Sequence, residues 1–414
     1  MEKNNQSQYI VKAISFLICL LPILLITGPF LPDLSICLSS ILFIYLLIKN
    51  KEIKFLHNKI YIFFFIFCAY LIIVSLNADN IFLSLGSSLF YFRFGLLSLI
   101  ICWLLINYKP FTNHFFYILL LAFLFLFFDS IYSLIFGSTI FGYEYDGVRF
   151  SSAFGEEKKL GSYISRLYPL IIFFILLKKN LPIKKIMILF MFCLSLILVT
   201  LSGERTAFFI FIAFNLISLF CIKNLFKLFS FNILIGIFIF TFIVLTNESI
   251  YERIINTTIR GFIDAENNIF IFTKNHQSHY LSSLMIFLDN PIFGIGPKMF
   301  REVCQYADYI VYDGCSTHPH NTYMQLLSEV GIIGFLPVMA IFLFSLYIIL
   351  SKVFSNIFAK DNHYTDHYML LHITIFLNLF PFIPSGSFFN NWMNIIYFIP
   401  IGFLLYTINK SKIK

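Results

Sequence analysis

Four histidines lie close to the entry of a long apolar segment. His318 and His320 belong to the stretch "CSTHPHNTYMQLLSEVGIIGF", and His276 and His279 stand one helical turn apart in an amphipathic segment that precedes it. A neutral imidazole accepts a proton near neutral pH and is also a common zinc ligand. The histidines therefore predict either a general base or a zinc site, although their spacing matches no established zinc motif.

Arginine is the second residue type with a clear chemical preference in this chain. Its planar, permanently charged guanidinium binds phosphate or carboxylate through two parallel hydrogen bonds, which lysine does not. Arg205 stands in the short connection "SGERT" between two apolar segments, a position that favours contact with an anionic lipid headgroup or ligand. A plain helix connection capped by Ser202 is the alternative. The arginines are Arg93, Arg149, Arg166, Arg205, Arg253, Arg260 and Arg301.

The composition requires a membrane around most of these residues. The chain has 414 residues, of which 59% are hydrophobic and 12% charged, and its mean hydropathy is +0.86. No single water-soluble core buries so much apolar surface, so we predict an all-α polytopic membrane protein with about 12 transmembrane helices. The first apolar run is followed at once by another, unlike a cleaved signal peptide. The predicted spans are 10–27, 31–48, 60–77, 83–107, 114–136, 160–177, 186–201, 206–222, 230–246, 322–350, 367–383 and 388–408.

Lysine sets the predicted orientation. Most lysines lie on the side of the two termini, which the positive-inside rule makes cytoplasmic, whereas no arginine lies there. The net charge of +8 follows from these lysines and does not indicate nucleic-acid binding. The periplasmic side holds the connections 137–159, 202–206, 247–321 and 384–391. We expect one membrane domain, residues 1–414, whose long, partly helical periplasmic loop at 247–321 joins spans 9 and 10 and carries part of the active site.

Two cysteines differ from the other six. Cys304 and Cys315 lie in the long loop, whereas the others lie in apolar segments, where a thiol acts as a small hydrophobe. An oxidising compartment would join this pair in a small ring directly before the histidines. We therefore predict a disulfide between them.

Three ionisable residues fall within predicted spans. A charge inside a span is costly unless it is paired or faces water, and Asp129 can pair with either Arg93 or Arg166. A transporter, the main non-enzyme alternative, would place polar residues along a path near the midplane, and only these three qualify. A structural scaffold would need none of the polar groups described above. The outer histidines and arginines therefore favour an enzyme.

An acidic metal site is a further alternative. The sequence "EYD" at 144–146 has the oxygen ligands that a divalent cation takes, but a lone E-x-D in a loop is a weak pattern. We therefore predict no metal and no cofactor.

Three motifs together resemble the bacterial O-antigen ligase and O-antigen polymerase superfamily. They are "SGERTA" after span 7, "DNPIFGIGPKMF" in the long loop and "HPHNTYMQLLSEVGIIGF" at the start of span 10. The resemblance implies a multi-pass inner-membrane protein that transfers a glycan from undecaprenyl diphosphate, without a nucleotide sugar, at the periplasmic face. Its implied partners are this donor, membrane lipids and an acceptor, either lipid A-core or another glycan. A ligase is favoured by length, topology and loop size, and a polymerase or a protein oligosaccharyltransferase stays open.

The resemblance also implies roles for individual residues. It assigns Arg205 to the donor diphosphate, and His320, followed by Asn321, to general-base catalysis. Many members carry another arginine upstream of the Asn-Pro of the loop, where this chain has His276. Diphosphate is already a competent leaving group, so the expected reaction is a metal-independent direct displacement with inversion. The candidates for the second diphosphate contact are His276, Arg260 and Arg301.

Overall fold

Helices make up almost all of the described chain. The computed structural model describes residues 2–56, 59–144, 149–178, 181–261, 272–312, 314–358 and 364–412, and these residues contain no β-strand. The α-helices are α1 (Glu2–Leu24), α2 (Phe30–Lys49), α3 (Lys59–Leu76), α4 (Ile81–Ser88), α5 (Phe92–Asn107), α6 (Pro110–Phe136), α7 (Leu160–Leu176), α8 (Leu181–Leu201), α9 (Arg205–Cys221), α10 (Phe226–Thr246), α11 (Glu248–Tyr251), α12 (Thr257–Gly261), α13 (Lys274–Asp289), α14 (Phe300–Val303), α15 (Thr322–Ile357), α16 (Asp366–Asn378) and α17 (Asn391–Lys412). Short 3-10 helices are η1 (Leu25–Thr27), η2 (Ile53–Leu56), η3 (Ser152–Glu157) and η4 (Lys223–Leu225), and η5 (Glu252–Asn256) is a π-helix.

Each predicted span coincides with a helix, and the all-α polytopic class is confirmed. Within the described residues, 9 helical segments are long and apolar enough to cross a membrane, α4 and α5 together forming one of them. The three remaining predicted spans are the shorter helices α7 and α9, of 17 residues each, and α16, of 13. Nearly every residue of α7 and α16 is buried in the bundle. A helix surrounded by protein need not match the bilayer thickness.

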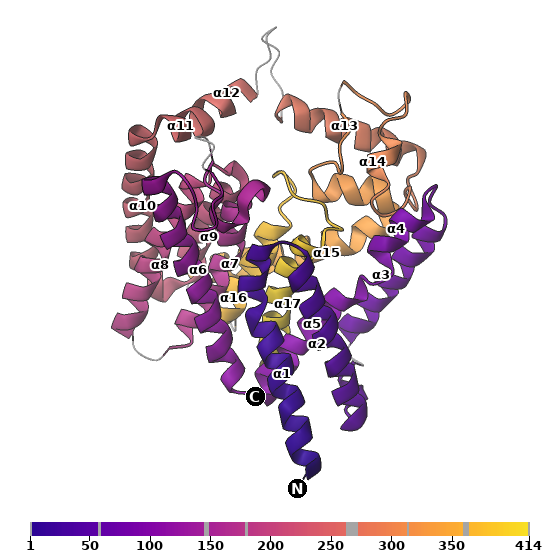
Figure 1. Cartoon of the computed structure of the whole chain (residues 1–414), viewed down its shortest axis with the longest axis horizontal. Coiled ribbons are helices and arrows are strands. Elements are labelled where there is room, and N and C mark those ends of the chain that lie inside the picture. The colour runs from indigo at the N-terminus through magenta and orange to yellow at the C-terminus, as the bar shows by residue number, and fades with distance from the viewer. Residues whose placement is uncertain are drawn as a thin grey trace.

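The long loop and the chain termini lie at opposite ends of the molecule. Figure 1 shows the N- and C-termini at one end and α11, α12, α13 and α14 at the other, which we call the loop end. Part of the loop has its own apolar core, in which Ile286, Met299 and Phe300 pack with Ala78 of the turn between α3 and α4. Nδ2 of Asn80 donates to Oε1 of Glu302 at 3.0 Å, which joins the same two segments.

The charged residues inside the bundle are paired differently from the prediction. Nε of Arg93 lies 2.7 Å from Oδ1 of Asp33, so α5 is tied to the start of α2. Asp129 instead accepts hydrogen bonds from the backbone N–H of Ile140 at 2.8 Å and from Oγ of Ser152 at 2.5 Å. The predicted pairing of Asp129 with Arg93 is therefore wrong, because the packing of α2 against α5 supplies a different acid. Arg93 and Asp129 therefore hold segments together, whereas Nε of Arg166 is buried without a hydrogen-bond partner among the described residues.

The tenth span, α15, is broken at Gly331, where φ is +61°. The break exposes the carbonyl groups of Ser328 and Glu329, which accept hydrogen bonds from the backbone N–H of Ile295 at 3.0 Å and of Gly296 at 2.8 Å. In return, N–H of Ile332 donates to the carbonyl of Pro291 at 2.9 Å. The motif "NPIFGIG" thus replaces the helical hydrogen bonds lost at the break, and the two sequence motifs form one structural unit.

Replacing Gly331 by alanine is expected to destabilise the protein. A Cβ atom there would lie 2.2 Å from the carbonyl oxygen of Ile292, and the left-handed backbone adds a strain of ~1–3 kcal/mol. The midpoint of thermal unfolding in detergent should therefore fall. Gly86→Ala is the matched control, because nothing lies within 4 Å of its added Cβ. Equal midpoints for the two variants would contradict this account.

Candidate active site

A cavity of about 940 Å³ opens at the loop end, where the three short central helices begin or end. The starts of α7 and α9 contribute residues, as do α13, the segment before α15 and the connection between α16 and α17. Its polar and charged lining includes Arg149, Lys159, Ser162, Arg166, Glu204, Arg205, Thr206, Arg253, Thr258, Thr273, His276, Arg301, Thr317, His318, His320, Ser385, Ser387 and Asn390. Positive groups thus greatly outnumber acidic ones in this cavity.

Three arginines from separate segments form one side of the cavity, which we call the arginine wall (Arg149, Arg205 and Arg253). Nη1 of Arg205 donates to Oγ1 of Thr258 at 3.2 Å. Nε of Arg253 is buried and has no hydrogen-bond partner among the described residues. Burial, and after it the charges of Arg205 and Arg149, lower the pKa of Arg253, so the three guanidinium groups lie close enough to repel one another. An anion with more than one negative charge would relieve that repulsion.

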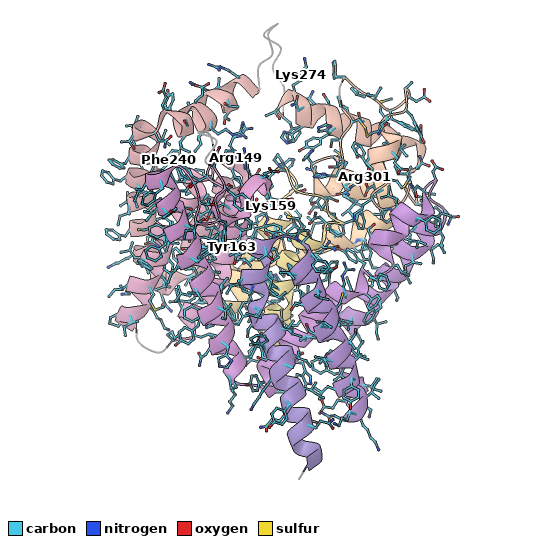
Figure 2. All side chains as sticks on the ribbon, in the orientation of Figure 1. Arg149, Lys159, Tyr163, Phe240, Lys274 and Arg301 are labelled. Atoms are coloured by element: carbon cyan, nitrogen blue, oxygen red, sulfur yellow. A yellow bond between two sulfur atoms is a disulfide. The ribbon has the colours of Figure 1, made fainter. Side chains whose placement is uncertain are left out.

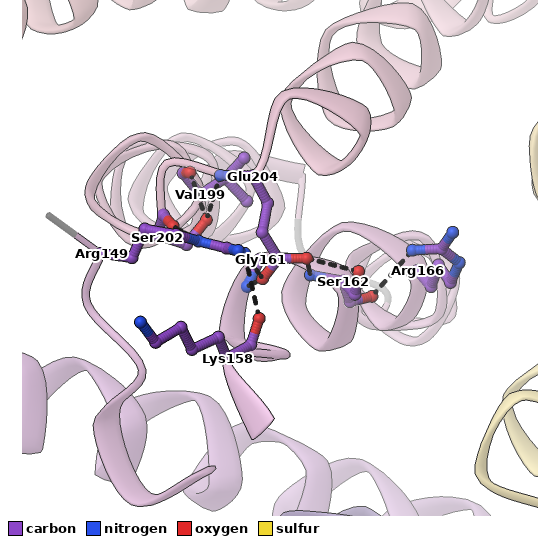
Figure 3. A network of polar contacts seen from close by, with 8 residues as sticks. All are labelled: Arg149, Lys158, Gly161, Ser162, Arg166, Val199, Ser202 and Glu204. Atoms are coloured by element: carbon purple, nitrogen blue, oxygen red, sulfur yellow. Dashed lines mark hydrogen bonds and ion pairs between the residues drawn. The ribbon is translucent and has the colours of Figure 1, made fainter. Parts of the chain in front are cut away.

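Glu204 anchors this wall to the first turn of α7 (Figure 3). Its carboxylate accepts hydrogen bonds from N–H of Gly161 at 2.8 Å, from N–H of Ser162 at 3.2 Å and from Oγ of Ser162 at 2.6 Å. It also lies 3.8 Å from Nη2 of Arg149, whose Nε donates to the carbonyl of Ser202 at 3.2 Å. Burial is the largest influence on Glu204 and raises its pKa. The connection that carries Arg205 is therefore held both by the first turn of α7 and by the side chain of Arg149.

The four predicted histidines lie together. The ring of His320 has its centroid 4.1 Å from that of His318, 5.3 Å from that of His279 and 5.8 Å from that of His276. Burial, reinforced by the neighbouring imidazoles, lowers the pKa of His320 to about 3. Burial likewise lowers the pKa of His318 to about 4. His320 is therefore neutral at neutral pH, which is the form that accepts a proton.

The backbone holds His320 in an unusual conformation. Its φ is +57°, in the left-handed region, and its carbonyl accepts a hydrogen bond from N–H of Ser385 at 2.8 Å. Such a conformation costs a residue with a side chain ~1–3 kcal/mol and persists only where the surrounding structure enforces it. The connection between α16 and α17 thus helps to direct the His320 ring into the cavity.

Asn321 serves the helix rather than the cavity. Its Oδ1 accepts hydrogen bonds from N–H of Tyr323 at 2.9 Å and of Met324 at 3.2 Å, which caps α15, and its Nδ2 donates to the carbonyl of Pro381 at 2.7 Å. The residue is 5% exposed and does not line the cavity. Asn321 thus caps α15 directly after His320, and the catalytic role predicted for it stays a prediction.

Of the three candidates for a second diphosphate contact, two line the cavity and one does not. Arg260 lies outside the cavity, with its side chain 74% exposed and its Nη1 3.0 Å from Oε1 of Glu252. His276 lines the cavity, and its Nδ1 is 2.5 Å from Oγ1 of Thr273. Burial, His279 and Arg205 all lower its pKa. Arg301 also lines the cavity, and Figure 2 shows it on the side opposite Arg149.

Several lining residues had no role in the prediction. Arg253 and Arg149 stand beside Arg205, and Nζ of Lys159 lies 5.4 Å from the ring centroid of Trp392. The available signal was the confinement of arginine to one side of the membrane. No local motif marked Arg253, and the cavity role of the connection at 384–391 rests on its contact with His320.

Neither metal alternative has a supporting geometry among the described residues. No group of three or more histidine, cysteine or acidic side chains in that part of the chain is placed to hold a metal ion, and this includes the four histidines. Of the "EYD" sequence, Glu144 forms an isolated bridge with Ser138, while Tyr145 and Asp146 lie outside the described residues.

Cys304 and Cys315 are joined by a disulfide in the structure, and the six other cysteines are free. The bridge closes a ring that ends three residues before His318. Replacing both cysteines by serine should lower the free energy of unfolding by about 2–4 kcal/mol, because the unfolded chain regains the freedom of the ring. Thermal unfolding in detergent, with Cys193→Ser as control, measures the loss. Labelling of all eight thiols in unreduced, denatured protein would contradict the bridge.

The segment that carries Arg205, Arg253, His276, Arg301 and His320 matches a known family. A family model described as O-antigen ligase matches residues 186–339. No curated protein matches the chain. The matched superfamily comprises glycosyltransferase-like ligases and polymerases. Residues 186–339, which contain the arginine after span 7 and the histidine before span 10, are thus similar to the O-antigen ligase superfamily.

Proposed function

We propose that the protein is a ligase-type glycosyltransferase that moves a glycan from undecaprenyl diphosphate to a hydroxyl of lipid A-core. One observation supports this most directly: a single cavity is lined both by the arginine wall and by His320. The reaction needs a fixed positive charge for the diphosphate and a neutral base for the hydroxyl. This cavity holds both kinds of group.

In the proposed reaction, His320 takes the proton of the acceptor hydroxyl as the acceptor oxygen attacks the anomeric carbon of the glycan. The bond from that carbon to the diphosphate oxygen breaks, and undecaprenyl diphosphate leaves with the bonding electrons. The new glycosidic bond then has inverted configuration. Arg205 and Arg253 stabilise the charge that develops on the leaving diphosphate. Arg253 thus takes the part expected of a second contact, and the proposal needs no metal and no nucleotide.

The proposed orientation places the loop end in the periplasm and both termini in the cytoplasm, within the bacterial inner membrane. The lysine distribution supports it, because most lysines lie toward the termini. On this proposal residues 1–414 form one membrane domain. The loop at 247–321 supplies the cavity with Arg253, His276 and Arg301.

Reconstitution tests the proposal. Purified protein in nanodiscs is mixed with undecaprenyl-diphosphate glycan and lipid A-core, and the products are identified by mass spectrometry. Glycosylated lipid A-core supports a ligase, whereas a longer lipid-linked glycan would identify a polymerase. Absence of both products would refute the proposed reaction. A chelator should leave the rate unchanged, and a loss that zinc or magnesium restores would overturn the metal-independent mechanism.

The pH profile of transfer follows from the lowered pKa of His320. An imidazole with the usual pKa of ~6.5 loses about tenfold of its neutral form between pH 7.5 and 5.5. With its pKa lowered to about 3, His320 stays neutral across that range. We therefore expect kcat/KM, which reports the free enzyme, to change less than about twofold between these pH values. An acidic limb with a midpoint near 6.5 would contradict this expectation.

A further inference from the structure

The cavity has a second cationic side, opposite the arginine wall. Arg301 lines it from α14, and Figure 2 places Arg301 and Arg149 on opposite sides of the loop end, with Lys159 between them. Arg301 and His318 line the same cavity, and the charge of Arg301 contributes to the lowered pKa of His318. Arg301 therefore lies apart from the arginine wall, and Lys159 and Arg166 are further positive groups of the same cavity.

Arg301 has no ion-pair partner within the described ranges of the chain. Its Nε is buried without a hydrogen-bond partner, and so is Nε2 of His318. The carboxylate of Glu329 is already held by the backbone N–H of Lys298 at 2.9 Å and by Nε2 of Gln325 at 2.9 Å. Arg301 itself is partly exposed toward the cavity, and its charge also acts on Glu329. The guanidinium of Arg301 is therefore placed to bind an anionic group of a ligand in the cavity.

The geometry of the displacement indicates which substrate, donor or acceptor, would contact Arg301. Displacement with inversion puts the attacking oxygen and the leaving diphosphate on opposite faces of the anomeric carbon. The arginine wall occupies the diphosphate side, and His320 must contact the acceptor hydroxyl. The ring of His320 lies 4.1 Å from that of His318, the histidine influenced by Arg301. An anion bound at Arg301 therefore belongs to the acceptor.

We propose that Arg301, together with His318, binds a phosphate ester of the lipid-anchored acceptor. This inference rests on the proposed glycosyl transfer. The chemistry is the same for two acceptors: the phosphate of lipid A-core in a ligase, or the diphosphate of a second lipid-linked glycan in a polymerase. In both, Arg301 sets the position of the acceptor relative to His320, while donor affinity depends on the arginine wall.

The test compares acceptors that differ only in phosphate. Arg301→Gln removes the charge, Arg301→Lys keeps the charge without the fork, and Arg260→Gln is the exposed control. Transfer to phosphorylated and to enzymatically dephosphorylated lipid A-core is measured in nanodiscs, with chain extension of undecaprenyl-diphosphate glycan as a third arm. Binding of donor and of phosphorylated lipid A-core to each variant is measured separately, which does not depend on turnover.

Arg301→Gln should raise the acceptor KM at least about tenfold for the phosphorylated acceptor, or for chain extension in a polymerase, with donor Kd unchanged. Arg301→Lys should fall between this variant and the unaltered protein. With dephosphorylated lipid A-core as acceptor, Arg301→Gln and the unaltered protein should have the same acceptor KM. A weakened donor Kd, or equal losses with both lipid A-core forms, would overturn the proposal. If the unaltered protein transfers nothing but still binds phosphorylated lipid A-core through Arg301, the anion site stands and the proposed function fails.

Discussion

His320→Asn is expected to lower the rate of glycan transfer by ~10²–10⁴, the usual contribution of a general base, while donor affinity stays unchanged. Asparagine is the sharpest replacement, because it tolerates the left-handed backbone that His320 adopts and therefore separates lost chemistry from lost structure. The measurement pairs initial transfer rates with binding of undecaprenyl-diphosphate glycan in nanodiscs. Unaltered stability of the variant would exclude unfolding as the cause.

Two further variants serve as comparisons for His320→Asn. His114→Ala alters an exposed histidine near the start of α6 and should have no effect. His318→Ala should be milder than His320→Asn. If His320→Asn transfers normally, or if it fails only because the donor no longer binds, the assignment of His320 as base is wrong.

Arg205→Ala is expected to lower transfer by ~10²–10³, because a fixed donor to the developing diphosphate charge is lost. Arg205→Lys keeps the charge but loses the fork, so it should recover only part of the activity. Both variants should also bind the donor more weakly, in contrast to His320→Asn. Binding and single-turnover rates with undecaprenyl-diphosphate glycan provide the comparison.

Arg260→Ala is the matched control, since Arg260 also lies at the loop end of the molecule but outside the cavity. It should transfer at the normal rate. A normal rate for Arg205→Lys would disprove the bidentate contact and leave simple charge attraction. An equal loss in Arg205→Ala and Arg260→Ala would show that activity responds to the loss of any positive charge at the loop end.

The helices were predictable because a membrane permits little else. Backbone groups in hydrocarbon must bond within their own segment, so each predicted span became a helix. The ends of α7 and α9 agree with the predicted spans to within one residue, whereas α16 ends at Asn378, five residues before the end of its predicted span. Ion pairs between residues far apart in the sequence could not be predicted either, because Arg93 pairs with Asp33 rather than with Asp129.

Site residues were predictable where a motif or a local rule applied. Asn321 precedes a helix, which is the ordinary place for an N-cap, and the structure shows it as the cap of α15. Arg253 and Arg260 lie on one short segment, yet the first lines the cavity and the second bonds Glu252. Their spacing could not distinguish them, because the π-helix at 252–256 alters the turn that would set their directions.

The break in α15 has a consequence for how the protein is made. As one straight helix its 36 residues would extend ~54 Å, well beyond a hydrocarbon core of ~30 Å. The hydrogen bonds that replace those lost at Gly331 come from residues 291–296, which in the proposed orientation must first cross the membrane. The first turns of α15, which follow His320, can therefore reach their final structure only after that segment has crossed the membrane. In the proposed orientation, a newly synthesised chain thus has no assembled cavity until residues 291–296 have crossed the membrane.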